Sequence, residues 1–235
     1  MKTKSLYARG FTLVELLVVI AIIAALAGIG VPVILRQQKK AALSEAISNA
    51  KEIGLAMMNF DSDYGSFPSD STAKTVKENT NTDLTLGTSS SNDYFRQLLA
   101  ASYCDAEKIF YVKTPYTKKP DNVIQGSKAL ENGEVGFGYI MASMTEAQSS
   151  SGNSGRPLLV TPLLNAGTDG TCDLDQFDKK AVVLRLDHSA TAETVRPADK
   201  QVNLGGGKTL LQTGTDTVWG TDVTPVIKPP LKSGG

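Results

Sequence analysis

The sequence predicts an α+β protein in which a long N-terminal helix packs on a small antiparallel β-sheet head. Residues 11–35 form an almost wholly apolar run, and residues 36–64 continue it with an amphipathic helical pattern. Beyond residue 65 come short, strand-like segments that no long helical pattern separates. Strands that follow one another without crossover helices form antiparallel sheets, so the fold class is α+β.

Composition narrows the class of protein further. Of 235 residues, 41% are hydrophobic and 20% are charged, which is enough apolar material for a packed core. The 24 basic side chains balance 24 acidic ones, so no basic excess exists to bind nucleic acid through its phosphates. Two cysteines and one histidine argue against a multi-ligand zinc site.

The apolar run is long enough to cross a membrane. Residues 11–35 read FTLVELLVVIAIIAALAGIGVPVIL and carry one charge, Glu15. As a helix they would span roughly 37 Å, more than the ~30 Å hydrocarbon core of a bilayer. The apolar side chains favour insertion by roughly 5 to 10 kcal/mol against a cost of about 3 kcal/mol for the acid. We therefore expect insertion despite Glu15.

Two simple interpretations of this run leave features unexplained. A plain membrane anchor does not account for Glu15, because an acidic side chain in hydrocarbon lowers the stability of the inserted helix. A secretory signal peptide could be cleaved after residues 25–27, Ala-Leu-Ala. The mature chain would then begin at Gly28 with the exposed apolar sequence GIGVPVIL.

A third interpretation uses a short motif at the start of the run. Residues 10–15 read GFTLVE and resemble the processing motif of type IV pilins and of the pseudopilins of type II secretion. The resemblance implies that a membrane peptidase cuts between Gly10 and Phe11 and that Phe11 is then N-methylated. Glu15 becomes the fifth residue of the mature chain, and Pro32 also matches the family pattern.

The chemistry of Glu15 agrees with this resemblance. A carboxylate in hydrocarbon must be neutralised or paired, and cleavage creates a cation at Phe11. The family implies that Glu15 pairs with the Phe11 amine of a neighbouring subunit as a filament assembles. An acid that is merely tolerated near a membrane interface is the alternative.

The resemblance also implies partners and a location. The expected partners are the prepilin peptidase, other copies of the chain, minor pilins or pseudopilins, and an inner-membrane assembly platform; no nucleic acid is expected. The chain would cross the bacterial inner membrane once, with its head outside the cytoplasm, and later join a periplasmic or surface filament. Charge does not decide the orientation, because three basic residues precede the apolar run and three follow it. They are Lys2, Lys4 and Arg9 before it, and Arg36, Lys39 and Lys40 after it.

The apolar run and the amphipathic segment predict one nearly continuous helix over residues 12–63, softened at Gly28, Gly30 and Pro32. Its amphipathic half places apolar residues on one face, which the head must cover. These residues are Leu43, Ile47, Ala50, Ile53 or Gly54, Met57 and Phe60. The sequence YGSFP at residues 64–68 ends the helix and is similar to the aromatic-proline stop of pseudopilins.

The head is expected to contain an exposed loop over residues 69–92, a short helix over residues 93–101 and a tail over residues 224–235 that is extended rather than sheet-forming. A hairpin is expected around His188. The candidate strands are residues 109–113, 135–142, 158–163, 181–187, 192–196 and 209–212. The resulting divisions are a leader (1–10), an apolar helix (11–35), its amphipathic half (36–64), the head (65–223) and the proline-rich tail (224–235).

Several groups of residues in the head resemble parts of functional sites. The GGGKT stretch at residues 205–209 lacks the first glycine of a phosphate-binding loop. Residues 187–189 are Asp, His and Ser, the residue types of a catalytic triad, but side chains of adjacent residues point in different directions and cannot form its geometry. An acidic loop could bind calcium or could simply be solvated; its members are Asp169, Asp173, Asp175 and Asp178. Cys104 and Cys172 form a candidate disulfide if the head lies outside the cytoplasm. No other cofactor and no catalytic residue is expected.

The sequence therefore predicts a pilin-like structural subunit, not an enzyme, of a type II secretion pseudopilus for protein export. A type IV pilus subunit, serving adhesion, motility or DNA uptake, remains an alternative. So does a membrane-tethered binding protein that does not polymerise.

Overall fold

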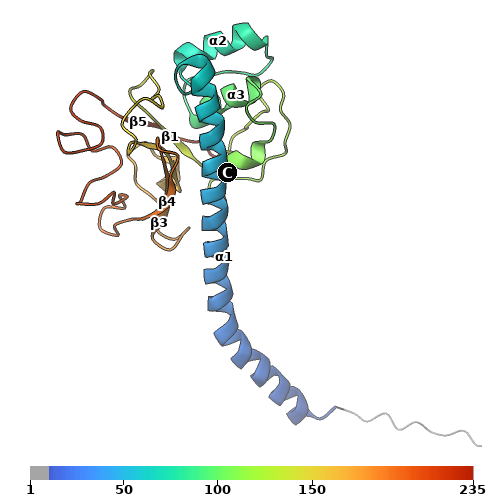
Figure 1. The fold of residues 1–235 in the computed structure, drawn as a ribbon. Helices are drawn as coiled ribbons and strands as arrows, with labels where there is room; N and C mark the ends of the chain where they lie inside the picture. The colour runs from blue at the N-terminus through green and yellow to red at the C-terminus, as the bar shows by residue number, and fades with distance from the viewer. Residues whose placement is uncertain (1–10, 235) are drawn as a thin grey trace, which may run out of the picture. The chain divides into compact units, whose positions relative to one another are not determined.

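The computed structural model describes residues 11–234 and has the expected α+β layout (Figure 1). The chain divides into two compact units, Met1–Lys40 and Ala41–Gly235. The helical elements are α1 (Leu13–Tyr64), α2 (Asp70–Thr80), α3 (Ser91–Ala100) and two 3₁₀ helices, η1 (Glu107–Phe110) and η2 (Leu164–Ala166). The strands are β1 (Gly138–Met141), β2 (Pro157–Thr161), β3 (Lys180–Arg185), β4 (Ala190–Thr194) and β5 (Val226–Lys228).

The long helix α1 confirms the prediction of one nearly continuous helix. It has 52 residues and contains the one segment of the described chain that is long and apolar enough to cross a membrane. Its backbone stays helical through Gly28, Gly30 and Pro32, so the softening there stays a prediction. The leader, residues 1–10, lies outside the described residues.

All pairings in the five-stranded sheet are antiparallel, as predicted, with the strand order β4-β3-β2-β1-β5. The predicted hairpin joins β3 to β4, with Val182 opposite Ala192. His188 in its turn has a φ of 66°, in the left-handed region that tight turns require.

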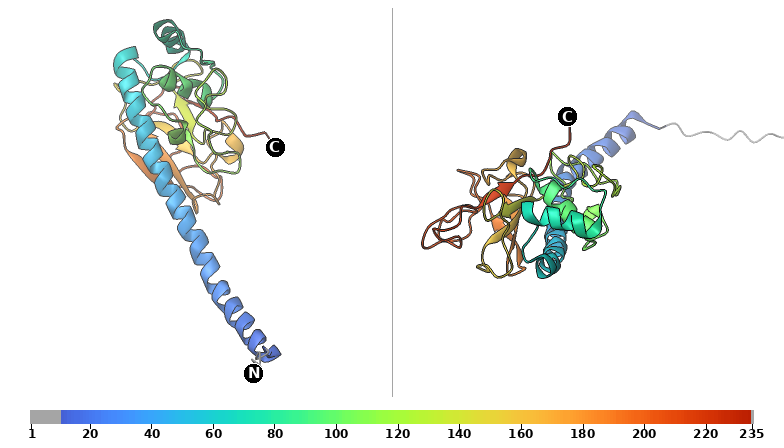
Figure 2. Two further views of the ribbon diagram at one scale, coloured as in Figure 1. Left: turned by 90° about the vertical axis from the view of Figure 1, so that its right-hand side faces the viewer. Right: turned by 90° about the horizontal axis from the view of Figure 1, so that it is seen from above.

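One face of the sheet packs on the part of α1 that belongs to the head. The figures show this part of α1 lying along the sheet (Figures 1 and 2). The predicted apolar stripe forms the contact: Ala50, Ile53 and Met57 are buried, and Leu43 and Ile47 are partly buried. The facing sheet residues include Tyr139 and Met141 of β1, Leu159 of β2, and Val182 and Leu184 of β3. Alternation along each strand puts these residues on one face.

The opposite face of the sheet holds a second buried cluster. Ile140, Val160 and Val183 alternate with the residues that face α1, and they pack against Trp219 and Ile227. The indole Nε1 of Trp219 donates a 2.7 Å hydrogen bond to the carbonyl oxygen of Leu210. The sheet is therefore buried on both faces, with α1 covering one and the C-terminal loops covering the other.

The prediction of an exposed loop over residues 69–92 was wrong, because α2 occupies much of it. Ser69 and Thr72 form a capping box that starts α2, and Ala73 and Val76 are its buried apolar residues. So weak an apolar pattern is hard to recognise against a polar background. The helix predicted over residues 93–101 is confirmed as α3, which begins two residues earlier and is capped by Ser90.

Three strand predictions were wrong. Residues 109–113 fall in η1 and irregular chain, and residues 209–212 form turns. The tail over residues 224–235, predicted not to join a sheet, supplies β5, in which Ile227 pairs with Ile140 of β1. The prolines that argued against a strand flank β5, so they remove no hydrogen-bond donor within it. The remaining four strand predictions are confirmed as β1 to β4; β1 to β3 are shorter than predicted, and β4 is shifted by two residues.

Replacing Ile227 by alanine should test the structural role of β5. Ile227 is 1% exposed, so Ile227→Ala should leave a cavity and lower the free energy of unfolding by about 2–5 kcal/mol. Urea unfolding of the full chain in detergent, followed by the fluorescence of the single tryptophan, measures this loss. Val226→Ala, at a half-buried neighbouring position, should cost about 1 kcal/mol or less. Equal effects of the two changes would contradict the inward placement of Ile227.

Candidate functional site

The candidate functional site is the amino-terminal end of α1. The large apolar side chains from Phe11 to Leu35 whose placement is described are all exposed in the single chain, and Phe11 itself is 75% exposed. Such a surface is stable only in a bilayer or against other apolar helices. Gly10, and with it the predicted cleavage site, lies outside the described residues.

Glu15 makes local hydrogen bonds with Thr12. The backbone N–H of Thr12 donates to Glu15 Oε2 at 2.8 Å, and its hydroxyl donates to the same oxygen at 2.7 Å. In return, the backbone N–H of Glu15 donates to the Thr12 hydroxyl oxygen at 3.2 Å. This reciprocal arrangement is a capping box, which satisfies otherwise free N–H groups at the start of a helix. Sequence reasoning missed the role of Thr12, although the T-x-x-E spacing was a signal for it.

The capping box leaves part of Glu15 available. Both hydrogen bonds reach Oε2, and within the described chain no donor contacts Oε1. The whole side chain is exposed on α1. A cation could therefore approach Oε1 without breaking the cap that holds the carboxylate in position.

Comparison with known proteins places a motif on this segment. Residues 6–31 match the family model of the prokaryotic N-terminal methylation motif, the prepilin-type motif of type IV pilins and pseudopilins. This motif implies processing by prepilin peptidase and assembly with other pilin subunits, and proteins that carry it are structural subunits rather than enzymes. No curated protein and no solved structure gives a significant match to the chain.

The four aspartates of the acidic loop do not gather into a metal site. The Asp169 carboxylate accepts hydrogen bonds from the backbone N–H and the hydroxyl of Thr171, and Asp173 accepts one from the backbone N–H of Asp175. Within residues 11–234, the one group of three potential metal ligands that lie within 4.8 Å of one another consists of Glu107, Asp121 and Glu134. The structure therefore gives no support to calcium binding at the loop that includes Asp175 and Asp178.

The Glu107 and Glu134 carboxylates tie loops of the head together. Glu107 is completely buried, and its two oxygens accept hydrogen bonds from the backbone N–H groups of Leu130 (2.7 Å) and Asn122 (2.8 Å). Glu134 accepts from the backbone N–H of Glu131 at 2.7 Å and from that of Asp121 at 3.3 Å. Burial raises the pKa of Glu134, and the neighbouring charge of Glu107 adds to this effect. Because every oxygen of both buried carboxylates has a donor, the arrangement serves structure and does not require an ion.

The candidate disulfide is not formed, because the two cysteines lie in different parts of the core. Both are free thiols. Cys104 packs against the cluster that includes α1, whereas Cys172 is buried in the cluster on the opposite face of the sheet. Burial is the main cause that raises the pKa of each thiol to about 12.

The residues rejected as catalytic or phosphate-binding have local structural roles. Asp187 accepts hydrogen bonds from the backbone N–H and the hydroxyl of its turn neighbour Ser189. His188 packs close to Gly54 of α1, and within the described residues its Nε2 has no hydrogen-bond partner. The three glycines of the GGGKT stretch all have positive φ angles, which is typical of a glycine-rich turn.

Thiol titration tests the placement of the cysteines. At pH 8, a thiol with a pKa of about 12 is almost wholly protonated, so both cysteines of the native chain should react slowly with Ellman's reagent. In urea without reductant, two thiols per chain should react quickly. A chain that releases no thiol in urea would contain the disulfide that the structure lacks.

Proposed function

We propose that this chain is a pilin-like structural subunit that prepilin peptidase processes and that assembles into a type II secretion pseudopilus. The observation that carries the proposal is the methylation motif at residues 6–31, whose residues from 13 onward lie on the exposed apolar part of α1. In this proposal the chain performs no catalysis. It is a substrate of the peptidase and then a building block.

The exposed surface of α1 supports assembly after membrane insertion. The described large apolar side chains between residues 11 and 35 are exposed in the single chain, so lipid or neighbouring helices must cover them. Cleavage before Phe11 would create an ammonium group, and methylation keeps its charge. The Phe11 ammonium of a neighbouring subunit could reach the open Oε1 of Glu15 and so neutralise it.

The resemblance of residues 64–68 to the pseudopilin stop supports our choice of a pseudopilus over a surface pilus. The YGSFP sequence that resembles the pseudopilin stop ends the helix: Gly65 has a φ of 77°, and Phe67 and Pro68 are buried. The backbone N–H of Gly65 donates to the carbonyl oxygen of Asp61 at 2.8 Å, which closes the last turn. A type IV pilus subunit and a tethered binding protein remain the alternatives.

Intact-mass analysis of the mature protein purified from membranes tests processing. We expect the mass of residues 11–235 plus one methyl group, because the motif places the cut before Phe11. A chain that starts at Gly28 would instead indicate a secretory signal peptide. An uncut Met1 would indicate a plain anchor.

Glu15→Gln separates the two roles of Glu15. Glutamine at this position can still complete a capping box with Thr12, but it carries no charge. We expect the variant to be cleaved and methylated like the wild type yet to lose most filament assembly, measured by shearing and sedimentation of overexpressed filaments.

A matched control is Glu45→Gln, which removes an exposed acid from α1 outside the apolar segment and should leave assembly intact. Wild-type assembly by Glu15→Gln would contradict the charge-pairing role of Glu15, whereas a wild type that forms no filaments would favour the tethered binding protein.

A further inference from the structure

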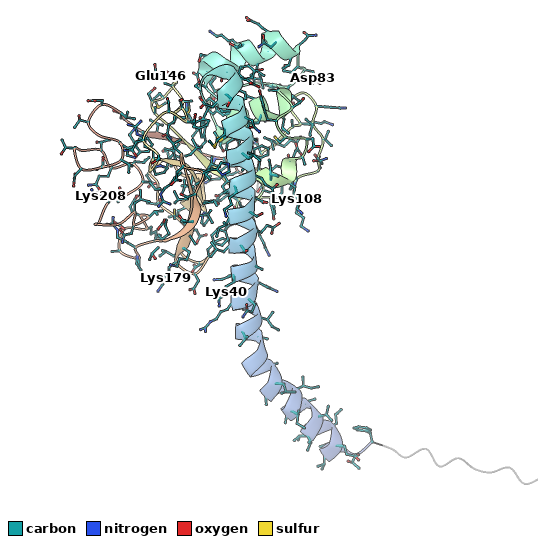
Figure 3. The ribbon with its side chains drawn as sticks, in the orientation of Figure 1. Lys40, Asp83, Lys108, Glu146, Lys179 and Lys208 are labelled. Carbon is teal, nitrogen blue, oxygen red and sulfur yellow. The ribbon has the colours of Figure 1, made fainter. Side chains whose placement is uncertain are left out.

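Three basic residues follow the apolar segment directly. Arg36, Lys39 and Lys40 are spaced at i, i+3 and i+4, so they project from one face of α1. All three are exposed, and Lys40 is labelled on α1 in Figure 3. We call these three residues the basic cluster.

Among the residues that the structure describes, the basic cluster has no counterion. The next acidic residue along α1 is Glu45, which lies five to nine positions away and so outside the i+3 and i+4 spacings of helical ion pairs. None of the salt bridges formed by residues 11–234 includes a member of the cluster. Its three positive charges are therefore available to an external anion.

The length of the apolar segment sets the depth of the basic cluster in a bilayer. Residues 11–35 span roughly 37 Å as a helix, against a hydrocarbon core of ~30 Å and a total thickness, with headgroups, of ~40–45 Å. Residues 36–40 would therefore emerge at or just beyond the headgroup layer. Long lysine and arginine side chains can bend back along the helix to reach it.

The charges around the segment change with processing. Lys2, Lys4 and Arg9 belong to the leader, so after cleavage before Phe11 the basic cluster supplies the basic side chains closest to the apolar segment, whose start carries the new Phe11 ammonium. In the proposed orientation, the cluster lies on the non-cytoplasmic side, where basic residues oppose the preferred topology. Basic residues on the non-cytoplasmic side make the proposed orientation less favourable. Their presence there suggests that they bind an anionic ligand at the non-cytoplasmic membrane surface.

We propose that Arg36, Lys39 and Lys40 bind the headgroups of anionic phospholipids at the carboxyl end of the apolar segment. The proposal rests on the membrane insertion in the proposed function but not on filament assembly. Each basic residue near an anionic membrane surface typically strengthens the interaction about fivefold, and salt screens the effect. The cluster would thereby hold α1 at a defined depth in the bilayer.

Electron paramagnetic resonance of spin-labelled lipids provides the test. The full chain is inserted into nanodiscs that contain equal amounts of phosphatidylglycerol and phosphatidylcholine, with a trace of spin label on one lipid or the other. The ratio of the two association constants measures headgroup preference. For the wild type, we expect a severalfold preference for phosphatidylglycerol at low salt that disappears at high salt.

The variants test whether the lipid preference depends on the charge of the basic cluster or on the net charge of the chain. Arg36→Gln/Lys39→Gln/Lys40→Gln should reduce the ratio to about one, whereas Arg36→Lys/Lys39→Arg/Lys40→Arg should keep it. The control removes the same charge from three exposed lysines of the head and should also keep the preference. This control is Lys74→Gln/Lys77→Gln/Lys128→Gln.

The lipid site alone would be overturned if the inserted wild type showed no preference for phosphatidylglycerol. It would also be overturned if the control lost as much of this preference as the cluster variant. A wild type that does not co-elute with nanodiscs would overturn the membrane function, and the lipid site with it.

Discussion

The structure depends on one constraint: the large apolar side chains described between positions 11 and 35 are all exposed in the single chain. Exposure of so large an apolar surface to water is unfavourable, so a lipid bilayer or another molecule must cover it. The methylation motif lies on this surface, and the charge of Glu15 lies near its start.

The same helix meets two different environments with two different patterns. Its first part is apolar on all sides, as a bilayer requires. Its second part is apolar along one stripe only. Ile53 and Met57 belong to this stripe and lie in the core of the head. No break in the helix marks the change, because both patterns are compatible with the same backbone geometry. The anchor and the head core are thus built on one continuous element.

The sequence was most informative where periodicity was strong. The long helix, its buried stripe and strands β1 to β4 were recognisable because hydrophobic residues repeat with the period of each element. Helix α2 was missed because only Ala73 and Val76 bury apolar side chains, and β5 was missed because prolines flank it. Local sequence could not reveal that Cys104 and Cys172 lie on opposite faces of the sheet, since that depends on the path of the whole chain. At the candidate site, the Thr12–Glu15 cap was readable from its spacing, whereas the open Oε1 required coordinates.

The position of β5 has a consequence for the order of events during synthesis. Strand β1 pairs with β2 on one side and with β5 on the other, and β5 follows all the other helices and strands in chain order. The sheet cannot be completed until these other elements have left the ribosome or a translocation channel, because its last strand emerges after them. The apolar segment precedes every strand of the sheet and emerges before them. A nascent molecule would therefore reach the lipid phase while its head is still unfinished, and tethering would precede the final closure of the fold.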